Sequence, residues 1–154
     1  MANILMTSFK QEILQGIHNF TNGSGGGTST TTGTGNVIKC ALFTSSASPA
    51  ASDTSYSTSN EVSGTNYSAG GNTLTKVTPT TSGTVSFLDF ADTTWSSSTI
   101  TARYALIYNS STTAGSANRA ILSLDFSSDQ SSSSGDFTIS FPTADSSSAI
   151  LRIA

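Results

Sequence analysis

The segment "GTVSFLDFADTTWSSSTITARYALIYN", residues 83–109, decides the fold class. Its two apolar stretches, 83–90 and 99–109, are rich in Val, Ile, Phe and Tyr, which favour strands. In the first stretch Val85 and Phe87 face one way while the intervening side chains face the other, which is the two-residue period of a strand. A short polar stretch separates the two, so the segment predicts two successive strands.

Similar runs recur along the rest of the chain, separated by Gly, Ser, Asn and Asp. They occupy residues 37–44, 73–80, 119–126, 135–142 and 149–154. Pro79 and Pro142 fall at strand ends, where a missing backbone N–H does least harm. Seven short strands at roughly even spacing predict an all-β fold, an antiparallel β-sandwich or jelly-roll-like domain over residues 37–154.

The first twenty residues follow a different pattern. Apolar side chains recur there at helical spacing, at Phe9, Ile13, Leu14, Ile17 and Phe20. Ser8 with Gln11 three residues later has the form of a capping box, so we expect a helix over residues 8–20. This N-terminal helical arm, residues 1–20, precedes a linker rich in Gly, Ser and Thr, residues 21–36. A short helix is unstable alone, so the arm must dock either on its own domain or on a neighbouring subunit.

The composition argues against several classes of partner. Only 10% of the residues are charged, the net charge is −3, and Ser and Thr make up more than a third of the chain. The six Lys and Arg residues are scattered, which does not suit binding to nucleic acid. No run approaches the roughly 20 apolar residues of a membrane span, and the N-terminus lacks the pattern of a signal peptide. We therefore expect no nucleic acid and no membrane partner.

Residues that could carry catalysis are few. His18 is the single histidine, and we expect it to be a surface or capping residue. Cys40 lies in the apolar run "VIKCALF", which is typical of a buried core thiol. The acid pairs Asp89 with Asp92 and Asp125 with Asp129 could bind Ca²⁺, but acids at strand ends more often hold turns. We predict no enzymatic activity, no metal site and no cofactor.

The stretch "EVSGTNYSAGGNTLT", residues 61–75, contains two adjacent glycines. A phosphate-binding loop would continue into a Lys and a helix, whereas this one continues into a predicted strand. The glycines therefore predict a turn with positive φ, with Tyr67 packed over it. Tyr56 lies in the long loop before this stretch, where contacts to partners often occur.

Three segments together resemble a group of small structural proteins encoded by tailed bacteriophages. They are "VIKCALFTSSA" continuing to "TSYSTSNEVSGTNYSAGGNTLT", then "LDFADTTWSSSTITARYALIYNSS", and finally "GDFTISFPTADSSSAILRIA". Members of this group share a short N-terminal helix, the Glu-Val-x-Gly-x-x-Tyr-x-x-Gly-Gly stretch, an Asp-x-x-x-Trp corner and an Arg-Ile-Ala end. The resemblance implies a virion protein but assigns no functional residues.

A capsid decoration or cement protein is the role we expect first. It would bind the outside of the shell in the virion, as a dimer or trimer, with the major capsid protein or another virion protein as partner. The expected contact residues are Phe9, Ile13, Leu14, Ile17 and Phe20 of the arm, followed by Tyr56 and Tyr67 of the loops.

Two alternatives remain open at this point. The first is a low-copy neck, tail or fibre-attachment protein. The second is a carbohydrate-binding module, which would need an exposed aromatic platform from Trp95, Tyr104 and Tyr108. Trp95 follows a strand corner, and we expect it to plug the end of the sandwich instead.

Overall fold

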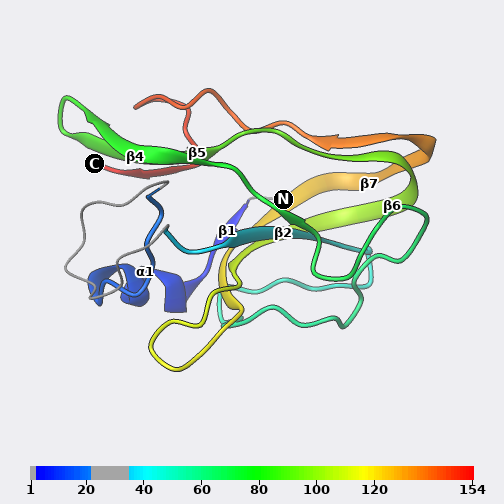
Figure 1. Cartoon of the computed structure of the whole chain (residues 1–154), viewed down its shortest axis with the longest axis horizontal. Helices are drawn as coiled ribbons and strands as arrows, with labels where there is room; N and C mark the ends of the chain where they lie inside the picture. Colours follow the sequence, from blue (N-terminus) through cyan, green and yellow to red (C-terminus); the bar gives the residue numbers. More distant parts are fainter. Residues whose placement is uncertain (1–2, 22–34) are drawn as a thin grey trace.

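The computed structural model describes residues 3–21 and 35–154, which form two antiparallel sheets packed face to face (Figure 1). The larger sheet has the strand order β1-β7-β6-β2-β3 and the smaller one the order β4-β5-β8. The strands of the larger sheet are β1 (Ile4–Leu5), β2 (Ile38–Phe43), β3 (Asn72–Thr73), β6 (Thr93–Asn109) and β7 (Arg119–Ile139). Those of the smaller sheet are β4 (Lys76–Ser82), β5 (Val85–Phe90) and β8 (Leu151–Ile153). The predicted all-β sandwich is confirmed.

The long hairpin of β6 and β7 differs from the prediction. Residues 119–126 and 135–142, expected as two strands, belong largely to the single strand β7, and β6 begins at Thr93 instead of residue 99. The polar residues between them stay in the ladder through pairing with β6, and hydroxyl pairs also join the two strands, as between Thr101 and Ser131 at 2.8 Å. The pairing of β6 with β7 is interrupted by register shifts, for example between Trp95 and Ser98, which are typical of β-bulges.

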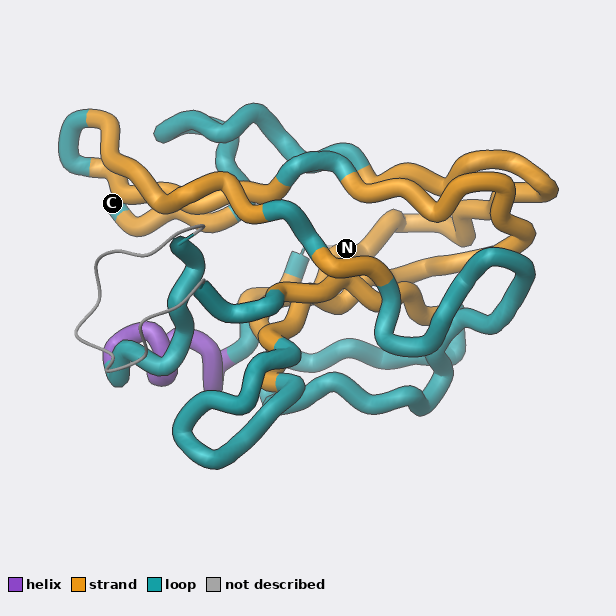
Figure 2. Tube along the Cα trace, viewed as in Figure 1, coloured by secondary structure: helices purple, strands orange, loops and turns teal. Residues whose placement is uncertain are grey.

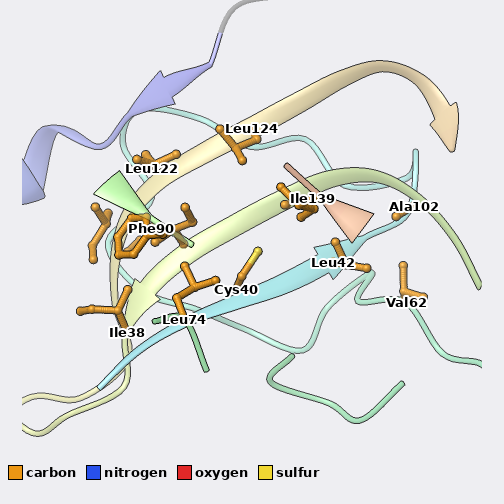
Figure 3. Close-up of a cluster of buried hydrophobic side chains, with 14 of the residues drawn as sticks. Ile38, Cys40, Leu42, Val62, Leu74, Phe90, Ala102, Leu122, Leu124 and Ile139 are labelled. Atoms are coloured by element: carbon orange, nitrogen blue, oxygen red, sulfur yellow. The ribbon is translucent and has the colours of Figure 1, made fainter. Parts of the chain in front are cut away.

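The hydrophobic core fills the space between the two sheets (Figure 3). The alternation within β2 shows how the sequence builds it, since Ile38, Cys40 and Leu42 are fully buried in this core. The smaller sheet contributes Leu88 and Phe90 from β5. The side chains on the other side of β2 do not join this core, so the larger sheet has a second face with a separate role.

The N-terminal helix α1 (Thr7–Leu14) is shorter than predicted. It ends before Gly16, whose φ of +67° lies in the left-handed region and stops the helical path. The capping-box prediction is also wrong. Met6 occupies the N-cap position without a side-chain hydrogen bond, and the hydroxyl of Ser8 is buried without a partner within the described residues.

The N-terminal segment docks on its own domain. β1 pairs with β7, the backbone N–H of Met6 donates to the Ile121 carbonyl at 3.0 Å, and the side chains of Met6 and Phe9 are fully buried. The predicted linker falls mostly outside the described residues, but the residues that flank the gap meet, since the Asn36 N–H donates to the Asn19 carbonyl at 2.7 Å. No helix of the described residues is long and apolar enough to cross a membrane.

Candidate interaction surface

Glu61 organises the loop that connects β2 to β3. Its Oε1 accepts hydrogen bonds from the Tyr67 hydroxyl and from the Gly70 N–H, both at 2.7 Å, and its Oε2 accepts one from the Tyr56 hydroxyl at 2.6 Å. The Tyr67 hydroxyl also accepts from the Leu42 N–H at 2.8 Å, which ties the loop to β2. One carboxylate therefore fixes three separated points of a long loop against the sheet.

The glycine pair of this loop makes a turn, as predicted. Gly70 and Gly71 have φ values of +89° and +65°. A Cβ atom at Gly71 would overlap the carbonyl oxygen of Cys40, so the position also requires the close approach of two backbones. The stretch that looked like a phosphate cradle is thus a structural turn packed on β2.

Tyr56 and Tyr67, expected as partner contacts, are half-buried and occupied within the chain. The Tyr56 ring stacks on that of Tyr108 at a centroid distance of 4.5 Å, and the Tyr67 ring lies 5.9 Å from that of Trp95. Burial and the hydrogen bond to Glu61 raise the pKa of both phenols, and burial raises that of Tyr108 to about 12. Both hydroxyls therefore act as neutral donors that hold the loop.

A second polar network joins the N-terminal helix to the larger sheet. Glu12 accepts from Arg119 of β7 at 2.5 Å and bonds the Nε2 atom of His18 at 2.7 Å. The Nδ1 atom of His18 lies 3.0 Å from the side-chain amide of Asn109, a fully buried residue of β6. The His18 side chain is only 1% exposed, so the expectation of a surface or capping histidine is wrong. The sequence carried no signal for this cluster, because its members are up to 107 residues apart.

The five apolar residues of the predicted arm differ in their burial. Phe9 is fully buried, while Ile13 and Phe20 are partly buried against the main core. Ile17 is half-buried. Leu14 points away from the core and is 88% exposed.

An apolar groove of about 130 Å³ lies between this N-terminal segment and the smaller sheet. Its walls include Ile13 and Phe20 on one side and Leu151 and Ile153 of β8 on the other. Ile153 is 56% exposed. Helix α1 and the end of β8 lie toward the same end of the molecule (Figure 1). We call Leu14, Ile13, Phe20, Leu151 and Ile153 the apolar end patch.

The remaining candidates for chemistry are structural. Cys40 is fully buried, as predicted, and burial raises the pKa of its thiol to about 12. Asp89 and Asp92 accept hydrogen bonds from the N–H groups of Phe90 and Phe141. Within residues 3–21 and 35–154, no three His, Cys, Asp or Glu side chains are grouped so that they could hold a metal ion.

The aromatic platform that a carbohydrate-binding module would need is not formed by Trp95, Tyr104 and Tyr108. Trp95 is 3% exposed and Tyr108 is 2% exposed, so neither ring offers a face to a sugar. Trp95 lies in the core beside Phe137, with ring centroids 6.1 Å apart, as expected for a residue that packs inside the sandwich. Tyr104 alone is half-exposed.

In the comparisons with known proteins, the chain matches no protein-family model, no curated protein and no solved structure.

Proposed function

We propose that this chain is a structural protein of a tailed-bacteriophage virion that binds the outside of the capsid as a cement or decoration protein. The resemblance of its motifs to small virion proteins motivates the proposal. The apolar end patch is the structural observation that carries it.

The apolar end patch has the properties of a contact surface for another protein. Leu14 and Ile153 are large apolar side chains exposed by 88% and 56%, and Ile153 also lines the groove, together with Ile13, the neighbour of Leu14 in the sequence. Covering such side chains contributes about 25 cal/mol for each Å² removed from water. The patch sits on a rigid body, since the helix that presents Leu14 is anchored to β7 through Glu12 and Arg119. A preorganised patch loses little conformational entropy on binding.

The low charge of the chain suits repeated contacts in a symmetric shell. Electrostatic steering of a partner would need a surface patch of charges of one sign. The charged residues are only 10% of this chain and are dispersed along it. The partner that fits is therefore the major capsid protein or another virion protein with an apolar contact.

The copy number per particle tests the proposal. Quantitative mass spectrometry of purified virions would measure this chain against the major capsid protein. Hundreds of copies in a simple ratio support a decoration protein. A few to a few dozen copies would assign it to the neck, tail or fibres instead, and complete absence from the particle would refute a virion role.

A pair of variants tests the surface itself. Leu14→Asp and Ile153→Asp place a charge in the apolar end patch, and Ser133→Asp places one on the exposed β6–β7 hairpin as a control. We expect the two patch variants to keep the wild-type melting temperature but to lose binding to capsids that lack this protein. Equal binding by the patch variants and the control would exclude this patch as the contact. Sedimentation of the free wild-type chain would show whether it is a dimer or trimer.

A further inference from the structure

A second cavity lies on the opposite side of the larger sheet, away from the core and the apolar end patch. Its volume is about 200 Å³, and it is formed between the outer face of the sheet and the loop of residues 44–60. Figure 2 shows this loop running along the side of the larger sheet that faces away from the smaller one. We call this cavity the serine cup.

The floor of the serine cup is built by the strand register. Ala41 of β2, Leu106 of β6 and Ser123 of β7 are aligned across the sheet, and neighbouring Phe43 shares their face. Leu106, Ser123 and Phe43 line the cup, so its floor combines an aromatic ring, an aliphatic side chain and one hydroxyl. This face packs in a cluster separate from the main core.

One polar group on the floor of the cup is open to its space. Ser123 is 3% exposed as a residue and lines the cup, and within the described residues its hydroxyl makes no hydrogen bond. Polar side chains at buried positions are normally hydrogen-bonded, so this hydroxyl marks a position where a ligand can bind. Ser55 and Asn60, also in the lining, are exposed, so their side chains are accessible to a ligand that enters from solvent.

The loop that forms the walls is held in place by its own hydrogen bonds. The Thr44 N–H donates to the Asn60 carbonyl at 3.0 Å, and the Tyr56 N–H donates to the Asn118 carbonyl at 2.8 Å. Asp53 accepts from the Ala50 N–H at 2.9 Å through Oδ2. The cup is therefore preformed, which lowers the entropic cost of binding a small molecule.

The chemistry of the lining defines the ligand class. Hydroxyl and amide groups around an aromatic and aliphatic floor complement a ring that has hydroxyls on its rim and C–H groups on its faces. The lining contains no cation and one acid, Asp53, which disfavours phosphate and other anions. The volume equals that of about seven water molecules, which suits one small ring and not a long chain.

We propose that the serine cup binds a single neutral sugar residue of a glycan. Phe43 and Leu106 would contact the face of the sugar ring, while Ser123, Ser55 and Asn60 would bond its hydroxyls. This binding goes beyond capsid attachment and uses different residues, so the same chain could attach to the particle through one surface and bind sugar through another.

NMR titration of the isolated full-length chain tests the proposal without any virion. The test ligands are the methyl glycosides of glucose, galactose, rhamnose and N-acetylglucosamine, each added up to about 50 mM, since single sugars bind weakly. We expect at least one glycoside to shift the backbone amide signals of Phe43, Leu106 and Ser123 and to saturate. We expect glucose 6-phosphate to bind more weakly than its neutral counterpart.

Variants of the cup identify the site. Ser123→Val removes the floor hydroxyl and fills space, and we expect it to weaken binding at least about tenfold. Ser55→Ala changes an exposed loop residue of the lining and replaces the first variant in this test if Ser123→Val does not fold. Ser133→Val, at an exposed position of β7 outside the cup, is the matched control. No shift with any glycoside, shifts confined to another surface, or wild-type affinity in the folded cup variants would each overturn the proposal.

Discussion

The side-chain amide nitrogen of Asn109 lies 3.0 Å from the Nδ1 atom of His18, and this contact fixes the protonation state of the histidine. The orientation of the Asn109 side-chain amide is fixed by two further hydrogen bonds. Its Oδ1 accepts from the Ser111 N–H at 3.0 Å, and its Nδ2 donates to Asn36 Oδ1, also at 3.0 Å. His18 Nδ1 is therefore an acceptor, and Nε2 carries the proton and donates to Glu12. A second proton would put two donors face to face.

This arrangement predicts that acid weakens the fold through His18. Burial lowers the pKa of His18 below its ordinary 6.5, against the opposing effect of Glu12, while Arg119 lowers it further. The unfolded chain then binds the proton more readily than the folded one, so stability is fully present above pH 6.5 and is lost as the pH falls toward the folded pKa.

Urea unfolding at a series of pH values measures this effect. We expect the free energy of unfolding to fall below pH 6.5 in the wild type, and this slope to be absent in His18→Gln, whose amide can still donate to Glu12. Other titrating groups, such as Asp89 with its raised pKa, are common to both chains and cancel in the comparison. An identical slope in the two chains would contradict the assignment.

The Glu61 network predicts unequal costs for two similar tyrosine substitutions. Tyr67→Phe removes the donor to Glu61 and also leaves the Leu42 N–H without its acceptor, whereas Tyr56→Phe removes one hydrogen bond. We expect a loss of about 2–3 kcal/mol for Tyr67→Phe and about 1 kcal/mol for Tyr56→Phe, measured by urea unfolding at neutral pH. Equal losses would show that the Leu42 contact contributes nothing.

Substituting two glycines with nearly equal φ angles distinguishes the cost of backbone strain from the cost of a steric clash. Gly71 has a φ of +65° and lies against the Cys40 carbonyl, while Gly83 has a φ of +59° and has no atom near its absent side chain. Gly83→Ala meets only the left-handed strain, about 1 kcal/mol. Gly71→Ala must also displace β2 or the turn, and we expect it to cost about 3 kcal/mol or more. Thermal unfolding of both variants checks this, and similar melting temperatures would be the contrary result.

The sequence predicted the strands that are rich in apolar residues and missed the strand segments that are polar. β2 and β5 were predicted because apolar residues dominate them, and both strands are buried or half-buried along their whole length. The middle of β7, a run of Ser residues with Asp129 and Gln130, resembles a loop in composition, and only its pairing with β6 makes it a strand. The requirement for tertiary pairing cannot be detected within the segment itself.

The candidate sites show the same division between local and long-range information. The glycine turn and the burial of Cys40 depend on neighbouring residues and were predicted correctly. The His18 network and the serine cup combine residues from distant segments, so no spacing in the sequence indicates them. The apolar residues of the helix were expected to form one face that contacts one partner. In the structure Phe9 is buried in the core of the domain, whereas Leu14 is exposed to solvent.

That division gives a last prediction. Phe9 is fully buried and packs against the rings of His18 and Phe20, with centroid distances of 4.9 and 6.1 Å. Phe9→Ala should therefore destabilise the isolated chain by about 3–5 kcal/mol. Leu14→Ala, on the same helix, removes an 88% exposed side chain and should change stability by less than about 0.5 kcal/mol. Urea unfolding of both variants decides the role of the helix. If Phe9→Ala were as stable as Leu14→Ala, the helix would be a separate arm and not part of the domain, because only an undocked helix can lose a large apolar side chain without cost.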